Sequence, residues 1–147
     1  MSKTSEKMAE AARKARETGD VNIMIDAIPY AKLLGIKGVE GKKDTFHLEP
    51  RKTNIGNPTL PALHGGAVGG FMELSASTYL MMEMDVFKVP KTVDFSIDFL
   101  RPGRFKDLYS RCVIQRFGSK LVNISIEAWQ DDETESVAKA RAQFLVE

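Results

Sequence analysis

A chain of 147 residues with 43% hydrophobic and 28% charged residues suits one globular domain and excludes a disordered or fibrous protein. A formal net charge of +1 excludes the basic excess that favours nucleic acid. The single cysteine, Cys112, cannot form a disulfide within the chain, which predicts a reducing compartment and a small apolar core residue.

The N-terminal region is expected to form two peripheral helices. Residues 4–18 place alanines and a methionine on one helical face, and Gly19 is a suitable end. Asp20 can cap a second helix over about 21–28, which Pro29 would disrupt. The region lacks the apolar segment of a signal peptide, and no apolar run is long enough for a membrane span, so a cytoplasmic protein is expected.

Two strands and a long loop follow. Residues 33–42 and 45–48 are predicted to be strands, with a hairpin turn at 41–44. Residues 49–63 show no clear period and are predicted to be a loop, which at this length is usually functional. A long helix is predicted from about His64 to Met84.

Four segments with a period of two complete the chain, at 93–99, 107–116, 122–128 and 138–146. The order of a hairpin, a loop, one central helix and an antiparallel meander predicts an α+β fold. We expect a single domain over 1–147 with a helical extension over about 1–30. The central helix is apolar nearly all round, so we expect a curled sheet around it and a second subunit on its remaining side.

The start of that helix has an unusual composition, "LHGGAVGGFMELSAS" from Leu63 to Ser77. Each glycine costs about 1 kcal/mol relative to alanine inside a helix. Glu73 lies among apolar neighbours, where an ionised carboxylate is unfavourable without compensation. Gly69 and Gly70 lie close to Glu73 on the helix surface and are interpreted as permitting close packing of a partner subunit or a ligand.

Three features together resemble the hotdog-fold acyl-CoA thioesterases, most closely the phenylacetate-pathway (PaaI-type) branch. They are HGG at the start of a long apolar helix, an acidic residue nine positions after the histidine, and the following strand "TVDFSIDFLRPG". "IPYAKLLGIKG" also resembles the entry to the first strand of that family. The resemblance covers about residues 28–146.

The resemblance implies a hotdog fold, in which a curled antiparallel sheet wraps one long central helix. It implies hydrolysis of an acyl-CoA to the free acid and CoA, with no cofactor beyond the CoA of the substrate. It also implies a homodimer or a dimer of dimers (a homotetramer) with each active site at a subunit interface, and no membrane or nucleic-acid partner. A non-catalytic acyl-CoA-binding hotdog domain and a hotdog acyl-CoA dehydratase are the alternatives.

By this resemblance His64 and Gly65 match the conserved pair of the family, and Glu73 matches the acid, supplied by the other subunit. The N–H of Gly65 would polarise the thioester carbonyl, and Gly66 would let it approach the backbone. Most PaaI-type members have aspartate in place of Glu73, which leaves open whether this carboxylate attacks the carbonyl or activates water. The alternatives are packing for the glycines, helix capping for His64 and an ion pair for Glu73.

Four further polar residues enter the expected site by the same resemblance. Asn54 and Asn57 both lie upstream of His64, and either can match the loop asparagine of the family. Ser77 and Thr92 match hydroxyl positions that hold the attacking water. For Ser77 the alternative is a hydrogen bond to its own helix backbone.

Basic residues near predicted turns are candidates to bind the phosphates of CoA or are solvated surface charges: Arg101, Arg104, Arg116 and Lys120. Several large residues of the central helix are candidates to line an acyl pocket or are core: Phe71, Met72, Met81, Met82 and Met84. His47 is interpreted as a strand-surface residue. Two distant histidines and one cysteine provide no metal-ligand spacing, so no metal is expected.

Overall fold

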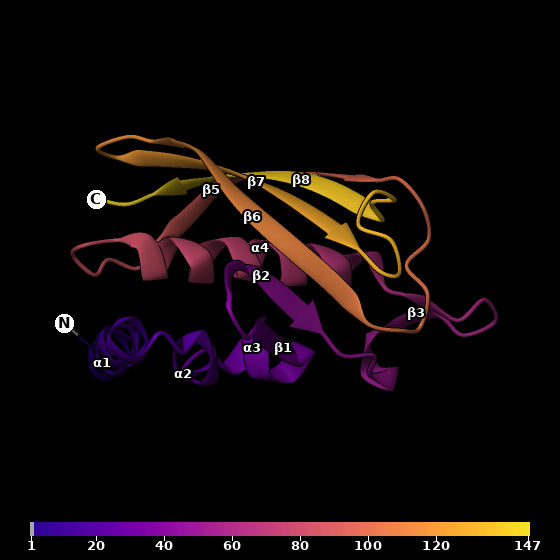
Figure 1. The fold of residues 1–147 in the computed structure, drawn as a ribbon, viewed down its shortest axis with the longest axis horizontal. Helices are drawn as coiled ribbons and strands as arrows, with labels where there is room; N and C mark the ends of the chain where they lie inside the picture. The colour runs from indigo at the N-terminus through magenta and orange to yellow at the C-terminus, as the bar shows by residue number, and fades with distance from the viewer. Residues whose placement is uncertain (1) are drawn as a thin grey trace.

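The structure is a computed structural model that describes residues 2–147. It has three layers, with a long helix between an antiparallel sheet and three N-terminal helices (Figure 1). The helices are α1 (Lys3–Thr18), α2 (Val21–Asp26), α3 (Pro29–Leu34), the 3-10 turn η1 (Lys52–Asn54) and α4 (Gly65–Glu83). The strands are β1 (Ile36–Val39), β2 (Lys42–Leu48), β3 (Ile55–Asn57), β4 (Ala62–Leu63), β5 (Lys91–Phe99), β6 (Leu108–Phe117), β7 (Leu121–Trp129) and β8 (Ala138–Leu145).

The main sheet has six strands in the order β1-β2-β6-β7-β8-β5, and every neighbouring pair is antiparallel. The predicted meander is correct for β6, β7 and β8. It is wrong for β5, which pairs with β8 at the far edge of the sheet instead of with β6. Both sides of β6 are already occupied, by the N-terminal hairpin strand β2 and by β7.

The N-terminal segment contains one helix more than predicted. Pro29 does not disrupt a helix but occupies the first position of α3, where its missing N–H and fixed φ are favourable. Gly35 ends α3 in the left-handed region (φ 91°), so the first strand starts at Ile36 and not at residue 33. The hairpin turn is also shorter than predicted, because β2 already begins at Lys42.

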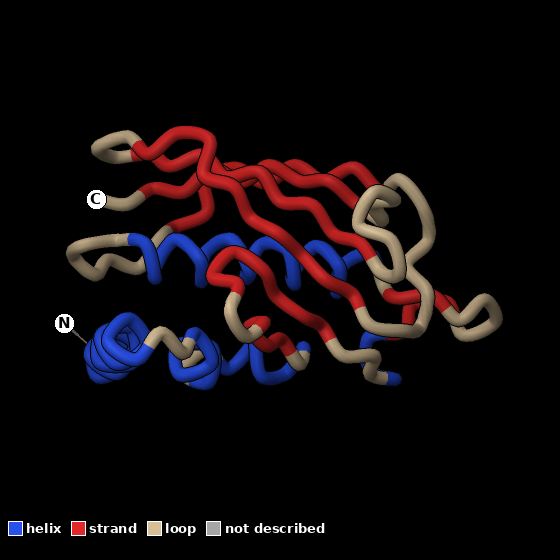
Figure 2. Tube along the Cα trace, in the orientation of Figure 1, coloured by secondary structure: helices blue, strands red, loops and turns tan. Residues whose placement is uncertain are grey.

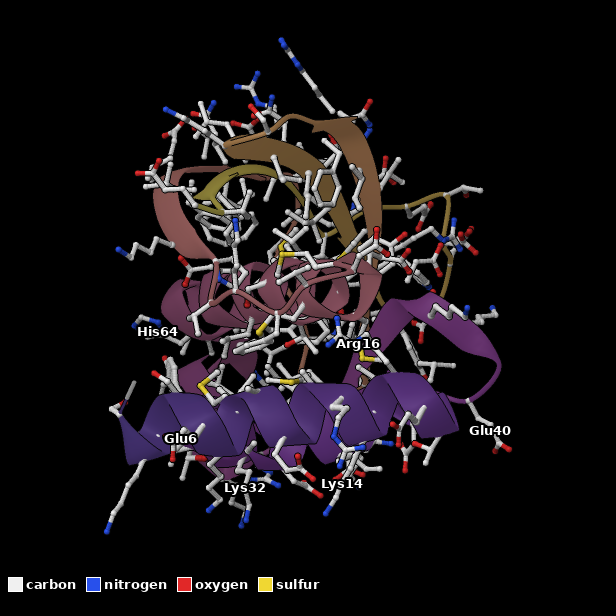
Figure 3. The ribbon with its side chains drawn as sticks, turned by 90° about the vertical axis from the view of Figure 1, so that its left-hand side faces the viewer. Glu6, Lys14, Arg16, Lys32, Glu40 and His64 are labelled. Atoms are coloured by element: carbon white, nitrogen blue, oxygen red, sulfur yellow. The ribbon has the colours of Figure 1, made fainter. Side chains whose placement is uncertain are left out.

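The three N-terminal helices cover the side of α4 that faces away from the sheet (Figures 1 and 3). Their buried side chains join the core formed by α4 and the sheet: Ala11, Ala12, Ala15, Met24, Ile25, Ala31 and Leu34. The guanidinium of Arg16 donates a hydrogen bond to the carbonyl of Met84 at the end of α4. The helices expected to be peripheral therefore form an outer layer whose buried faces contribute to the core, and they cover a side of α4 on which a second subunit was expected.

The segment predicted to be a loop at 49–63 contains η1 and a small two-stranded sheet, β3 and β4 (Figure 2). Leu63 at its end donates its N–H to the carbonyl of Gly103 (2.8 Å). The segment thereby holds the residue that precedes α4. Among residues 2–147 no helix combines the length and the apolar character needed to cross a membrane.

Candidate active site

His64 is the N-cap of α4 and organises the first turn of the helix. Its Nδ1 accepts a hydrogen bond from the N–H of Gly66 (2.8 Å), so the neutral imidazole carries its proton on Nε2. The N–H groups of Ala67 and Val68 donate to the His64 carbonyl (3.0 and 3.1 Å). The N–H of Gly65 donates to no acceptor in the part of the chain that the structure describes, so it is available to a ligand.

The segment before α4 positions His64 through its backbone. The carbonyl of Asn54 accepts the N–H of His64 (2.7 Å). A Cβ on Gly56 would lie 2.8 Å from the Cα of His64, so this close approach requires glycine. The loop predicted to be functional therefore fixes the backbone at the start of the helix.

The side chains of the two candidate asparagines are engaged away from Gly65. The buried amide of Asn54 donates through Nδ2 to the carbonyl of Leu34, the last residue of α3 (3.0 Å). The exposed Asn57 accepts the N–H groups of Thr59 and Leu60 at its Oδ1 (3.0 and 3.2 Å) and stabilises the turn before β4. Asn54 links two elements of the site, whereas Asn57 closes a local turn.

Two elements flank the exposed strip of α4. A Cβ on Gly65 would lie 3.3 Å from Cζ of Phe99 on β5, and one on Gly69 would lie 3.9 Å from Cε1 of Phe95. A Cβ on Gly70 would instead lie 3.4 Å from Cδ1 of Leu34 on α3. Successive helical residues are rotated by about 100°, which directs Glu73 between the β5 side and the α3 side. Glu73 therefore emerges on the open side of α4. Figure 3 places His64 at the edge of the same layer, between the sheet and α1.

Glu73 is half-buried, although its apolar sequence neighbours suggest that it is fully enclosed. Three glycines on its side of the helix lack side chains that would cover it. Its carboxylate forms no ion pair or hydrogen bond with any residue in 2–147, so the alternative of a structural ion pair receives no support within the described chain. Ser77, one turn further on, donates its Oγ to the carbonyl of Leu74 (3.2 Å).

A bulge in β5 decides where Thr92 lies. The register shifts between Thr92 and Asp94, so Thr92 pairs with Phe144 and shares its helix-facing side of the sheet. Four residues along α4 and two along β5 both span about 6 Å. Gly65 lies beside Phe99, and Gly69 lies beside the middle of β5. The same step of four helix residues from Gly69 leads to Glu73, and the matching step along β5 leads to the bulge. Thr92 therefore lies on the helix-facing side of β5, toward the end of the strand that is remote from Gly65.

The four candidate basic residues divide between the two ends of the sheet. Arg101 donates to the carbonyl of Ser136 (2.9 Å), and Arg104 donates to that of Leu60 (3.3 Å), both near the start of α4. Arg116 and Lys120 flank the β6–β7 turn at the opposite end, where β7 and β8 are level with Lys91. Of the four candidates, Arg101 and Arg104 therefore lie at the end of the sheet where α4 begins.

Two other groups of candidates have structural positions. The large residues of α4 lie in the core: Phe71, Met72, Met81 and Met84 are buried, and Met82 is partly buried. His47 lies on a sheet surface as expected, where its Nε2 contacts Asp107 (2.7 Å) and its ring stacks on Tyr109. Within residues 2–147 no three His, Cys, Asp or Glu side chains are grouped so that they could hold a metal ion.

Sequence reasoning missed α3, which brings Tyr30 and Leu34 against Gly70. The signal was present in "IPYAKLLG", because proline before the first turn and glycine after the last are the usual limits of a helix.

Residues 60–137 match the Thioesterase superfamily, and the chain belongs to this superfamily. The resemblance to hotdog-fold thioesterases drawn from the sequence is confirmed, and so is the expected fold. Superfamily membership supports thioester hydrolysis as the general activity.

Solved structures with the same fold extend this comparison. A protein of Chromobacterium violaceum is 39% identical (TM-score 0.76), and the match covers 94% of this chain and 97% of that one. A phenylacetic acid degradation-related protein of Ralstonia eutropha is 22% identical (TM-score 0.71; 86% and 98% covered). A Bacillus halodurans protein solved with CoA is 17% identical (TM-score 0.69; 98% and 88% covered). No curated protein matches the sequence.

Proposed function

We propose that the protein hydrolyses an acyl-CoA to the free acid and CoA. The observation that carries this proposal is the N–H of Gly65, which has no acceptor in residues 2–147 and lies at the positive end of a 19-residue helix. Superfamily membership supports a thioester substrate. The relative solved with CoA supports CoA as the thiol.

Gly65 binds the thioester carbonyl oxygen in this mechanism. Negative charge develops on that oxygen in the transition state, and the N–H together with the helix dipole stabilises it. His64 contributes by holding the N–H of Gly66, which fixes the first turn and the direction of the Gly65 amide. The ring of Phe99 lies beside Gly65 and limits water at the carbonyl.

Glu73 is too far along α4 to act on a carbonyl bound at Gly65 of its own protomer. Eight residues of helix correspond to about 12 Å, which exceeds the reach of a glutamate side chain. A complete site therefore requires Glu73 of the partner subunit. A two-fold axis beside α4 would create two such sites, because each copy supplies one Gly65 and one Glu73.

The edge strand β5 is the proposed contact between the two copies. It is nine residues long and exposed, and its outer edge pairs with no strand in the described chain. Val93 and Phe99 on this strand are 53% and 55% exposed, and long edge strands are usually covered or blocked in native proteins. The strand also flanks the side on which Glu73 emerges, so pairing there completes the sheet and the site together.

Hydrolysis then proceeds by attack of water on the carbonyl carbon. Glu73 accepts a proton from the water as the oxygen–carbon bond forms, while Thr92 and Ser77 position the water. The carbon–sulfur bond breaks, the CoA thiolate leaves and takes up a proton, and the acid is released. Direct attack by the Glu73 carboxylate would give an enzyme anhydride that water hydrolyses in a second step. Arg101 and Arg104 are proposed to bind CoA phosphates near the start of α4.

A thiol-release assay over a panel of acyl-CoAs tests the proposal. A thioesterase releases one CoA for each acid formed, and its rate saturates as the acyl-CoA concentration rises. Saturable binding of the same acyl-CoAs without CoA release would refute hydrolysis and identify a binding domain. Release of water from a 3-hydroxyacyl-CoA without thiol formation would identify a dehydratase.

A further inference from the structure

Gln130, the first residue after β7, holds the loop between β5 and β6 (residues 100–107) through its side-chain amide. Its Oε1 accepts the N–H of Arg104 (3.0 Å), and its Nε2 donates to the carbonyls of Arg104 (2.8 Å) and Lys106 (3.3 Å). Loop backbone lacks the regular partners of a helix or a sheet, so a side chain that satisfies three of its groups fixes the path of the loop.

The same loop borders β4, the short strand before α4. The carbonyl of Gly103 accepts the N–H of Leu63 (2.8 Å), and Arg104 pairs with Ala62 in an isolated antiparallel bridge. The guanidinium of Arg104 also donates to the carbonyl of Leu60 (3.3 Å). The β5–β6 and β7–β8 loops lie at the same end of the molecule as β3 (Figure 1). Strand β4 is therefore held between the β5–β6 loop and β3.

Leu63 is joined directly to the residues that form the start of α4. A shift of Leu63 moves His64, whose carbonyl shares one rigid peptide group with the N–H of Gly65. Groups that act on a reacting atom must be held within about 0.5 Å of their productive geometry. The hydrogen bonds of Gln130 thus bear on the direction of the Gly65 amide, although no step of the proposed hydrolysis uses Gln130.

We propose that Gln130 is a positioning residue for thioester hydrolysis. It acts through Gly103 and Leu63 on the N–H of Gly65 and touches neither the acyl-CoA nor the reacting atoms. This inference rests on the proposed function, because it assumes that the Gly65 amide binds the thioester carbonyl. The rival interpretation is that Gln130 closes the loop without any effect on the start of the helix.

Gln130→Glu tests the proposal because it keeps the shape of the side chain and makes its donor depend on pH. The carboxylate can still accept the N–H of Arg104, but it cannot donate to the carbonyls of Arg104 and Lys106. Single-turnover CoA release at about pH 8 should fall by about 3- to 10-fold relative to the wild type. Protonation gives the carboxyl a donor again, so this ratio should return toward one as the pH is lowered to about 5.

Two further variants serve as controls. Gln130→Met removes all three hydrogen bonds and cannot titrate, so its ratio to the wild type should stay low at every pH. It also keeps the test available if Gln130→Glu does not fold. Gln115→Glu places the same charge at an exposed position on β6 and should leave the ratio at one. Urea titration at each pH establishes that the rates refer to folded protein.

Full CoA release by both Gln130 variants, or a deficit of Gln130→Glu that does not depend on pH, would overturn the positioning role. If the wild-type protein releases no CoA at all, the proposed hydrolysis fails, and the amide signals of Leu63 and Gly65 are followed by NMR instead. A change of the Gly65 signal in Gln130→Glu that reverses at low pH would then support the positioning role. A Gly65 signal equal to that of the wild type at every pH would refute it.

Discussion

The backbone carbonyl of Asn54 accepts the N–H of His64 at 2.7 Å, while the side chain of the same asparagine donates to the end of α3. One residue therefore joins the helix that carries Tyr30 to the helix that carries Gly65 and Glu73. Its side chain acts as a cap for α3, and the geometry of the candidate site depends on it.

The Asn54→Asp substitution tests this link. The aspartate has nearly the same shape, but its carboxylate cannot donate to the carbonyl of Leu34 and leaves that carbonyl unsatisfied in a buried position. We expect a loss of about 1–3 kcal/mol in the free energy of unfolding, measured by urea titration. Asn57→Asp is the control, because Oδ1 there only accepts hydrogen bonds and the residue is exposed. Equal stabilities of the two variants would contradict the assignment.

Gly65→Ala should lower turnover without unfolding the protein. The new methyl would lie 3.3 Å from the ring of Phe99, which is exposed and can move, so the fold tolerates it. The methyl and the displaced ring crowd the carbonyl at the helix start, and we expect a loss of about 10²–10³ in single-turnover CoA release. Gly69→Ala is the control, since its methyl meets Phe95 and Ile97 at ordinary distances of 3.9 and 4.0 Å. If both variants retain full turnover, the glycines serve packing alone.

Glu73→Gln should separate chemistry from stability. The substitution preserves size but removes the proton acceptor, so turnover should fall by roughly 10²–10⁴. The urea midpoint should stay level, because the half-buried carboxylate has no ion pair within residues 2–147. Glu83→Gln, in the last turn of the same helix and exposed, should change neither quantity. A Glu73→Gln protein that is destabilised yet catalyses normally while folded would assign the residue to the fold.

The proposed pairing of β5 predicts a dimer at low micromolar concentration, measured by sedimentation equilibrium. Val93→Lys introduces a charge on the exposed edge and should weaken the dimer at least about 10-fold, since lysine is a usual means of blocking edge strands. Turnover should fall in proportion to the dimer fraction because the site is shared. Val113→Lys, 48% exposed on the interior strand β6, should leave the dimer intact. A wild-type protein that sediments as a 16.4 kDa species and still hydrolyses acyl-CoA would exclude the shared site.

The buried thiol of Cys112 should make stability depend on alkaline pH. Burial, with a smaller effect of the Asp44 charge, raises the pKa of the thiol well above its ordinary value of 9.0. The folded protein therefore keeps the proton that the unfolded chain releases. Stabilisation by the neutral thiol is complete below pH 9 and is lost as pH rises.

This loss is measurable as a difference between two proteins. Between pH 9 and pH 11 the unfolding free energy of the wild type should fall relative to Cys112→Ala, with a slope that approaches about 1.4 kcal/mol per pH unit. Comparison with this variant cancels the titration of other groups. Parallel pH profiles would show that Cys112 ionises in the folded protein.

Local patterns were sufficient to predict α4 and the last four strands from the sequence. The period of two in β5 to β8 and the long apolar segment after His64 each reflect burial by nearby elements. The place of β5 beside β8 could not be predicted, because it depends on β2 occupying the other edge of β6. The alanine face of α1 was visible in the sequence, but the pattern does not say which element that face packs against, and here it joins the core of α4 and the sheet.

The candidate site was predictable in its residue types but not in all its contacts. The histidine, glycines and glutamate follow the motif at the start of α4. The side-chain bond of Asn54 to Leu34 joins residues 20 positions apart through a helix that the sequence reading did not include. The bulge that places Thr92 on the helix-facing side breaks the alternation from which its direction would be read.

The order of the layers along the chain bears on how the protein emerges from the ribosome. When α4 has been synthesised, β6, β7 and β8 do not yet exist, and at about 5–20 residues per second they follow over roughly 3 to 12 seconds. During that interval the most apolar helix of the nascent chain lacks its sheet. Helices α1 to α3 have already been made, so the side of α4 that they cover in the folded protein can be buried before the sheet is complete.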